Sequence, residues 1–334
     1  MTVTIKQSYL FLLDNKHNLF MPTECPVDET IDGAYHFLEK SIEKCIKNPA
    51  GRPGKFQETS ESRQEFMSYR QRTTSFLDFA KHIAMKRFEF KDRYELFTPT
   101  DLFMCEIEWN EDIFIVGLEL TCQEGVVHHV NQTDKGIQNN LLLHQAILPN
   151  VSLKNANFFM INEDTMELTL LESLVSTEDD DTYLYADKIL ECQTEISVKE
   201  AVKKARVVVD EIVETHQLDK LEIVPALERT IKEAINEGND LNIKEIAEEV
   251  FYQTPEAKKS YVKEMKNQGI EKPIINPNKV KLPLKKKQKI KTDTGIEITI
   301  PLDYYNNKDY IELENTPDGR IAIRLKNIGV VENA

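Results

Sequence analysis

The sequence predicts an α+β fold, with an N-terminal antiparallel sheet that carries helices, a central helical bundle and a C-terminal β-hairpin region. Three observations predict this arrangement. Strand-like apolar runs separated by turn residues dominate the first 175 residues, the apolar period changes to that of a helix after residue 183, and strict alternation returns after residue 295. We therefore expect domains at 1–175, 183–269 and 296–330, with a lysine-rich linker over 270–295.

The first region is expected to begin with a strand, because apolar residues alternate or run together between positions 3 and 13. An amphipathic helix is expected from about residue 29 to residue 46, and the sequence NPAGRPG at 48–54 ends it. Apolar residues recur at helical spacing over 74–88, which predicts a second amphipathic helix.

Two strand pairs are expected next, each joined by a short polar turn. The paired segments are 102–109 with 113–121 and 157–162 with 166–171. Glu106, Glu108 and Glu119 alternate with apolar neighbours in the first pair. Because successive side chains of a strand point to opposite faces, one face of this sheet is predicted to be acidic and exposed to solvent.

The second region is predicted to be helical after an acidic break at 176–182. Ser197 suits the N-cap of its first helix. Pro225 predicts a kink or a break in the next helix, since proline cannot donate a backbone hydrogen bond. The expected helices cover 198–213 and 218–236, and two more open at Asn242 and Thr254.

Composition excludes several classes of protein. The 334 residues carry 57 acids and 42 bases, a net charge of −15, which argues against a protein that coats nucleic acid with its whole surface. No run of eighteen apolar residues and no secretory signal pattern occur, so we expect neither a membrane span nor secretion. The five cysteines are scattered and form no zinc-ligand pattern, as expected for reduced thiols in the cytoplasm.

The sequence contains no enzyme signature. The phosphate-binding patterns G-x-G-x-x-G and G-x-x-x-x-G-K-[ST] are absent, as are G-x-S-x-G and H-E-x-x-H. His128 and His129 lie beside Asn131 and Asp134, so a metal or nuclease site is one interpretation. We favour a structural one, because adjacent residues of a strand point to opposite faces. The sequence therefore predicts no catalytic residue, no cofactor and no metal.

Positive charge is concentrated near the C-terminus. Eight lysines and no acid fall within 272–291, so the rest of the chain carries −23, and prolines keep this segment from forming a helix. Extended lysines can follow a phosphodiester backbone and displace its counterions without reading sequence. The alternative is a solvated linker that offsets the acidic bulk, and the sequence leaves both open. The candidate DNA-binding lysines are Lys279, Lys281, Lys285, Lys286, Lys287, Lys289 and Lys291.

A second basic stripe is expected on the C-terminal hairpin. Arg320, Arg324 and Lys326 share one strand face and are further candidates for phosphate contact. Alternatively, Glu312 and Glu314 on the partner strand are their cross-strand ion partners, and we favour this pairing. A third basic group surrounds the second helix, where we favour a solvated helix face over a binding surface. It consists of Arg63, Arg70, Arg72, Lys81, Lys86 and Arg87.

Short strings spread in order over most of the chain carry a family resemblance. They are FLDFA at 76–80, the hairpin run at 101–122, AILP at 146–149, YLYADKILEC at 183–192 and the segment 298–329. On these strings the chain resembles the bacterial nucleoid-associated proteins of the YejK/NdpA type. The resemblance implies a cytoplasmic protein of the nucleoid that binds DNA without enzymatic activity and influences DNA topology or organisation. It also implies type II topoisomerases as candidate partners, because members of this type have been linked to them.

Three functional hypotheses follow from the residues and the resemblance together. The first is a non-enzymatic DNA-binding protein with phosphate contacts and weak sequence preference. The second is an acidic interaction module that reaches the nucleoid through a protein partner such as a type II topoisomerase. The third and least favoured is a metal-dependent nuclease around His128 and His129. No membrane partner is expected, and the sequence leaves open whether the protein is an oligomer.

Overall fold

The computed structural model confirms a mixed α+β architecture. It describes residues 2–14, 16–31, 33–90, 93–94, 96–134, 136–151, 155–176, 181–276, 287–305, 307, 309–315 and 320–330. The chain divides into two compact units, residues 1–196 and residues 197–334. Within the described residues, no helix is long and apolar enough to cross a membrane.

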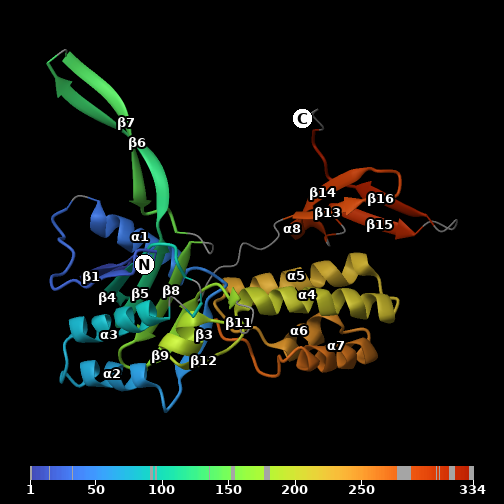
Figure 1. Ribbon diagram of the computed structural model, residues 1–334. Helices are drawn as coiled ribbons and strands as arrows, with labels where there is room; N and C mark the ends of the chain where they lie inside the picture. The colour runs from blue at the N-terminus through green and yellow to red at the C-terminus, as the bar shows by residue number, and fades with distance from the viewer. Residues whose placement is uncertain are drawn as a thin grey trace. The chain divides into compact units, whose positions relative to one another are not determined.

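The first unit is built on an antiparallel sheet that has eight strands among the described residues (Figure 1). Their order across the sheet is β12-β3-β9-β8-β5-β4-β1-β2. The strands are β1 (Thr4–Asp14), β2 (Leu19–Met21), β3 (Arg52–Phe56), β4 (Thr100–Trp109), β5 (Asp112–Thr121), β8 (Ala156–Asn162), β9 (Glu167–Leu171) and β12 (Cys192–Thr194). A separate short pair joins β10 (Val175–Ser176) to β11 (Asp181–Thr182).

Helices cover both faces of this sheet (Figure 1). They are α1 (Ala34–Ile46), α2 (Glu61–Arg70), α3 (Phe76–Glu89) and the short π-helix η1 (Leu184–Ile189). On β4, Leu102 and Met104 belong to the buried cluster that contains residues of α2, α3 and η1. Their neighbours Phe103 and Cys105 point the other way, into the cluster that contains residues of α1. The sheet therefore lies between two apolar cores.

This two-sided burial corrects one prediction. The strand pairs β4–β5 and β8–β9 are confirmed, but the face that carries Glu119 is not an exposed acidic surface. Glu119 is 2% exposed, because α2, α3 and η1 cover that face.

The start of α1 at Ala34, rather than near residue 29, is a second correction. Gly33 precedes it with a φ of 82°, a left-handed backbone that ends the preceding loop.

Helix α2 and strand β3 are among the elements of the first unit that were not predicted from the sequence. Helix α2 carries few apolar residues, and its N-cap Ser60 accepts a hydrogen bond from the backbone N–H of Arg63. Strand β3 contains Pro53 and Gly54, which the sequence indicated as a turn, yet it pairs with β9 and β12. Strand β12 and η1 come from residues 183–196, so a segment expected in the helical domain contributes to the first unit.

A long two-stranded arm extends from the first unit (Figure 1). It consists of β6 (Gln123–Thr133) and β7 (Gly136–Ile147), which form a sheet of their own. The ladder runs without interruption from the pair Val126 and Leu143 to the pair Thr133 and Gly136. Neither strand pairs with any other described strand.

The second unit begins with the predicted helices. They are α4 (Val198–Thr215), α5 (Lys220–Asn236), α6 (Ile243–Val250) and α7 (Pro255–Asn267). Ser197 caps α4 by accepting a hydrogen bond from the N–H of Glu200, and Asn242 caps α6 in the same way from Lys244. Pro225 lies inside α5, so of the two predicted outcomes, a kink or a break, the break does not occur. Gly238, with a φ of 74°, follows the end of α5.

Small hairpins complete the second unit. They are formed by β13 (Lys287–Lys291) with β14 (Glu297–Pro301), and by β15 (Ile311–Asn315) with β16 (Ile321–Leu325). Helix α8 (Leu302–Tyr305) follows β14. Ile300, Tyr305 and Ile311 form a small buried core, against which Leu221 of α5 packs. The finer division into a helical domain, a lysine-rich linker and a C-terminal β region remains a prediction.

Candidate nucleic-acid interface

The β13–β14 hairpin places three of the candidate lysines on one face. Lys287, Lys289 and Lys291 alternate along β13 and are exposed, whereas Ile290 between them packs against the small apolar core. Because side chains alternate across a strand, the lysines form a row on the face away from that core. Lys279, Lys281, Lys285 and Lys286 lie outside the described residues.

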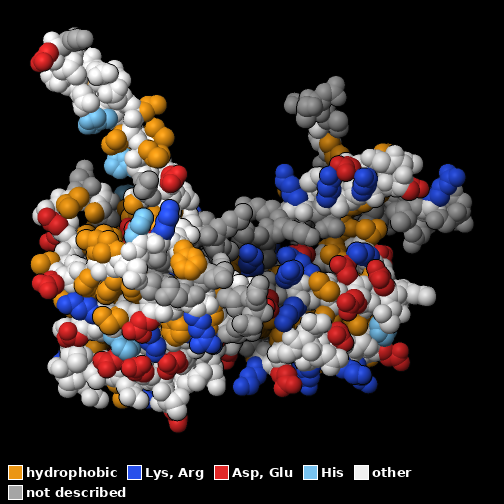
Figure 2. Space-filling model, in the orientation of Figure 1, with side chains coloured by type: hydrophobic (Ala, Val, Ile, Leu, Met, Phe, Trp, Pro, Cys, Tyr) orange, Lys and Arg blue, Asp and Glu red, His pale blue; other side chains and the backbone are white. Residues whose placement is uncertain are grey.

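One carboxylate of the partner strand lies against this row. The Nζ of Lys289 is 2.6 Å from a carboxylate oxygen of Glu297, and both side chains are about half exposed. An ion pair in such a solvated position contributes little energy, so a phosphate can replace the carboxylate. Figure 2 shows Lys and Arg side chains gathered over the β13–β14 hairpin.

The β15–β16 hairpin confirms the favoured prediction of cross-strand ion partners for Glu312, whereas the Glu314 side chain lies outside the described residues. Glu312 lies directly opposite Arg324 in the ladder. Its carboxylate is 3.9 Å from the Arg324 guanidinium and also contacts the Nζ of Lys326. Two cations share one carboxylate, which lowers the positive charge that this stripe presents. Arg320 is exposed at the start of the same strand.

A lysine-lined hollow between α6 and α7 was not predicted. It has a volume of about 460 Å³ and is lined by Lys244, Glu248, Lys258, Lys259, Val262, Lys263 and Lys266. Lysines recur three and four residues apart on α7, which is the signal that reveals such a face. However, α6 and α7 together carry five lysines and five glutamates, and Lys258 pairs with Glu248. The hollow therefore has little net charge.

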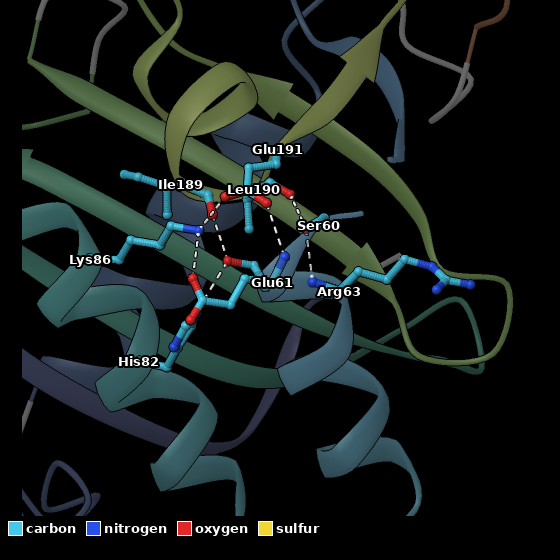
Figure 3. A network of polar contacts seen from close by, with 9 residues as sticks. Ser60, Glu61, Arg63, His82, Lys86, Ile189, Leu190 and Glu191 are labelled. Carbon is cyan, nitrogen blue, oxygen red and sulfur yellow. Dashed lines mark hydrogen bonds and ion pairs between the residues drawn. The ribbon is translucent and has the colours of Figure 1, made fainter. Parts of the chain in front are cut away.

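Three members of the basic group around α2 and α3, Arg72, Lys86 and Arg87, form ion pairs within the first unit. Figure 3 shows Lys86 of α3 pointing toward two carboxylates, with its Nζ 2.7 Å from Glu191 and 3.5 Å from Glu61. In the same network the Ser60 hydroxyl donates to the carbonyl of Leu190 at 2.8 Å. These contacts join the start of α2 to the end of η1. Arg63 extends away from them (Figure 3).

Arg87 is not a surface cation, which corrects its assignment to a basic face. It is 2% exposed, and its guanidinium binds both carboxylate oxygens of Glu119 at 2.6 to 3.1 Å. The Tyr185 hydroxyl donates to the same carboxylate at 2.7 Å. Burial alone opposes ionisation of Glu119, but the Arg87 charge and these hydrogen bonds hold its pKa below the ordinary value. The pair fastens α3 to the sheet.

A second buried ion pair lies at the N-terminus of η1. Arg52 of β3 is 3.1 Å from Glu172, and both side chains are buried. Glu172 also accepts hydrogen bonds from the backbone N–H groups of Tyr185 and Ala186. The Arg52 guanidinium lies 3.4 Å from the centre of the Tyr183 ring. Like Arg87, Arg52 holds the fold together and is not available to a ligand.

The histidine pair behaves as the structural interpretation predicts. In the β6–β7 ladder His128 lies opposite Leu141 and His129 lies opposite Asn140. Neighbouring residues of one strand point to opposite faces, so the two rings do not converge. In the part of the chain that the structure describes, no three His, Cys, Asp or Glu side chains are grouped in a way that could hold a metal ion.

Comparison with known proteins identifies one family. The family model described as nucleoid-associated protein YejK matches residues 13–332, nearly the whole chain. The match spans both units, from β1 to the residues after β16, and confirms the resemblance inferred from the short strings. No curated protein sequence matches the chain significantly.

Proposed function

Because the chain belongs to the family of the nucleoid-associated protein YejK, we propose that it binds DNA directly, through phosphate contacts and without catalysing a reaction. The observation that carries this proposal is the row of Lys287, Lys289 and Lys291 on the outer face of β13. We include in the proposed contact Lys279, Lys281, Lys285 and Lys286, which precede β13 in the sequence, and Arg320, Arg324 and Lys326 at the neighbouring hairpin.

The spacing of the row suits a polyphosphate. Alternate residues of an antiparallel strand lie about 6.8 Å apart, close to two axial phosphate steps of one DNA strand. Each lysine is a point charge without the planar fork that reads a base, so the contact is insensitive to sequence. Such binding needs no base-specific pocket and no catalytic group.

Charge is distributed so that DNA approaches the C-terminal region. Residues 270–330 contain twelve bases and eight acids, a net charge of +4, which leaves −19 on the rest of the chain. A polyanion is therefore attracted to one region and repelled by the others, which orients the encounter.

The same charge distribution favours a second candidate function. A surface with a net charge of −19 outside the C-terminal region suits a basic protein partner, such as a DNA-binding enzyme of the type II topoisomerase class. In that case the chain reaches the nucleoid through its partner, and purified protein does not bind naked DNA.

A salt titration of DNA binding by the full chain tests the proposal. The triple variant Lys287→Gln, Lys289→Gln, Lys291→Gln removes three phosphate contacts, so the slope of log K against log salt should become shallower by about 2.7. Affinity should fall alike on DNA fragments of different sequence. Fluorescence anisotropy at several salt concentrations measures both quantities.

A matched variant on α7 provides the control. Lys259→Gln, Lys263→Gln, Lys266→Gln removes the same charge from the lysine-lined hollow. It should change the slope of log K against log salt by less than about 0.9, the value for one phosphate contact. An unchanged slope in the β13 variant would exclude that row as the contact. Wild-type protein that binds DNA only after a topoisomerase is added would support the second candidate instead.

A further inference from the structure

The β6–β7 arm carries an unusual pattern of exposed apolar residues. The ladder register places one set of side chains on a single face, at positions 126, 128, 130 and 132 of β6 and 137, 139, 141 and 143 of β7. Five of these eight are aliphatic and between 55% and 77% exposed: Val126, Val130, Ile137, Leu141 and Leu143. Figure 2 shows hydrophobic side chains gathered along the arm.

The opposite face of the arm is more polar. It carries His129 and Asn131 on β6 and Gln138 and Asn140 on β7, with Val127 and Leu142 near the base. These two aliphatic side chains are less exposed than the five on the first face. The arm is thus an amphipathic ribbon whose apolar face is open to water in the single chain.

Such a ribbon needs a partner for physical reasons. An isolated two-stranded hairpin is only marginally stable in water, and a covering layer usually stabilises it. The five aliphatic side chains expose on the order of 500 Å² of apolar surface, at the size that marks interaction sites on soluble proteins. Burying this face removes apolar surface from water and fixes the ribbon at the same time.

The charge of the arm indicates what kind of partner it takes. Residues 123–147 contain one lysine and no arginine, against Glu124 and Asp134. Affinity for DNA comes mainly from lysine and arginine side chains that neutralise phosphates, so an arm with a single lysine does not suit a polyanion. Between positions 126 and 143 the apolar face carries His128 as its single titratable side chain. Two copies of the chain, each at −15, meet here without juxtaposing like charges.

We propose that the apolar face of the β6–β7 arm is a self-association surface, which packs against the same face of a second copy across a two-fold axis. Two such faces together bury about 1,000 Å² of apolar surface, which is the lower limit for a specific protein–protein interface. A two-fold arrangement uses one patch on both chains, so a uniformly apolar ribbon is complementary to itself. The inference does not rest on DNA binding.

The test measures the mass of the full chain by light scattering after size exclusion, over a range of concentrations and without DNA. Wild-type protein should be a dimer. The double variant Val130→Glu, Leu141→Glu places two carboxylates on the apolar face and should yield a monomer. The matched variant Asn131→Glu, Asn140→Glu adds the same charge one residue along each strand, on the opposite face, and should remain a dimer.

Each other outcome overturns the proposal. If the wild-type protein is monomeric at every concentration, the proposed self-association does not occur. If the Val130→Glu, Leu141→Glu variant stays dimeric, the interface lies elsewhere. Loss of the dimer in both variants shows that charge on either face is sufficient, so the apolar face is not the determinant. If the apolar-face variant loses DNA affinity with no change in mass, the arm contacts DNA. Far-UV circular dichroism confirms that both variants retain the fold.

Discussion

The buried arginines of the first unit and the lysines on β13 of the second unit use their positive charges in opposite ways. In the first, Arg87 and Arg52 are buried against Glu119 and Glu172, and Lys86 is shared by two carboxylates. In the second, the lysines of β13 lie in solvent, and the carboxylate of Glu297, which pairs with Lys289, is itself exposed. The comparison shows that the number of basic residues in a region says little about the charge available to a ligand.

Burial explains the difference. A guanidinium removed from water requires a carboxylate and hydrogen bonds of good geometry, and removing one partner leaves an uncompensated buried charge. A solvated lysine keeps its water and exchanges one anion for another at little cost in free energy. The buried pairs of the first unit therefore fix its fold, as the pair of Arg206 with the buried Glu228 does in the second unit. The lysines of β13 are instead cations that a phosphate can reach.

The largest expected effect comes from breaking a buried pair. Arg87→Met leaves the Glu119 carboxylate unpaired in the core, so the first unit should lose about 3–5 kcal/mol of unfolding free energy. Trp109, the single tryptophan, lies in β4 of that unit, and its fluorescence during urea unfolding reports on the first unit separately. Lys6→Met, which breaks the exposed pair with Glu108, is the control and should cost less than about 1 kcal/mol. Equal losses of unfolding free energy in the two variants would contradict the distinction between buried and exposed ion pairs.

Acid should reduce the contribution of the buried pair. The folded pKa of Glu119 is held below its ordinary value of 4.5 because Arg87 and hydrogen bonds outweigh burial. A carboxyl whose folded pKa is depressed contributes stability above its unfolded pKa and loses it as the pH falls through the folded value. In Arg87→Met the carboxyl keeps its burial but loses this partner, so its pKa rises and it takes up a proton at a higher pH than in the wild type. The difference in unfolding free energy between the two proteins should therefore narrow steadily as the pH falls from 7 through the depressed wild-type pKa. A gap that is constant from pH 7 to pH 3 would contradict the assigned role of Arg87.

The smallest effect is expected at the exposed pair of the second unit. Glu297→Gln removes the carboxylate that competes with phosphate for Lys289, so DNA affinity should rise about twofold to fivefold. Glu264→Gln on α7 makes the same change of charge away from β13 and should leave affinity unchanged. Anisotropy titrations at low salt measure both variants. A fall in affinity for Glu297→Gln would indicate that this carboxylate holds Lys289 in its binding position.

Local signals in the sequence predicted most elements correctly. Ser197 and Asn242 cap the helices that follow them, and the turn at Asn110 and Glu111, both with positive φ, joins β4 to β5. Each of these signals depends on residues within about four positions of one another, which a sequence shows directly. Strand β3 was missed because Pro53 and Gly54 favour a turn locally, and its pairing partners β9 and β12 lie more than a hundred residues away.

The candidate site was predictable only in part. The concentration of lysines followed from composition, but the segment was expected as a linker, so the row that Lys287, Lys289 and Lys291 form on a paired strand was not predicted. The pairing of Glu312 with Arg324 followed from the expected hairpin. The hollow between α6 and α7 depends on how two helices pack, which spacing within one helix does not give.

The sequence by itself determined where most of the helices and strands form and that positive charge is concentrated after residue 270, because periodicity, caps and charge runs are local properties of the chain. Only the tertiary structure decided which charges are buried and which face of the β6–β7 arm is apolar. Burial of Glu119 against Arg87 requires α3 to lie on the sheet, and the arm's face requires one particular register. Both depend on contacts between distant residues, whose free energy no local pattern encodes.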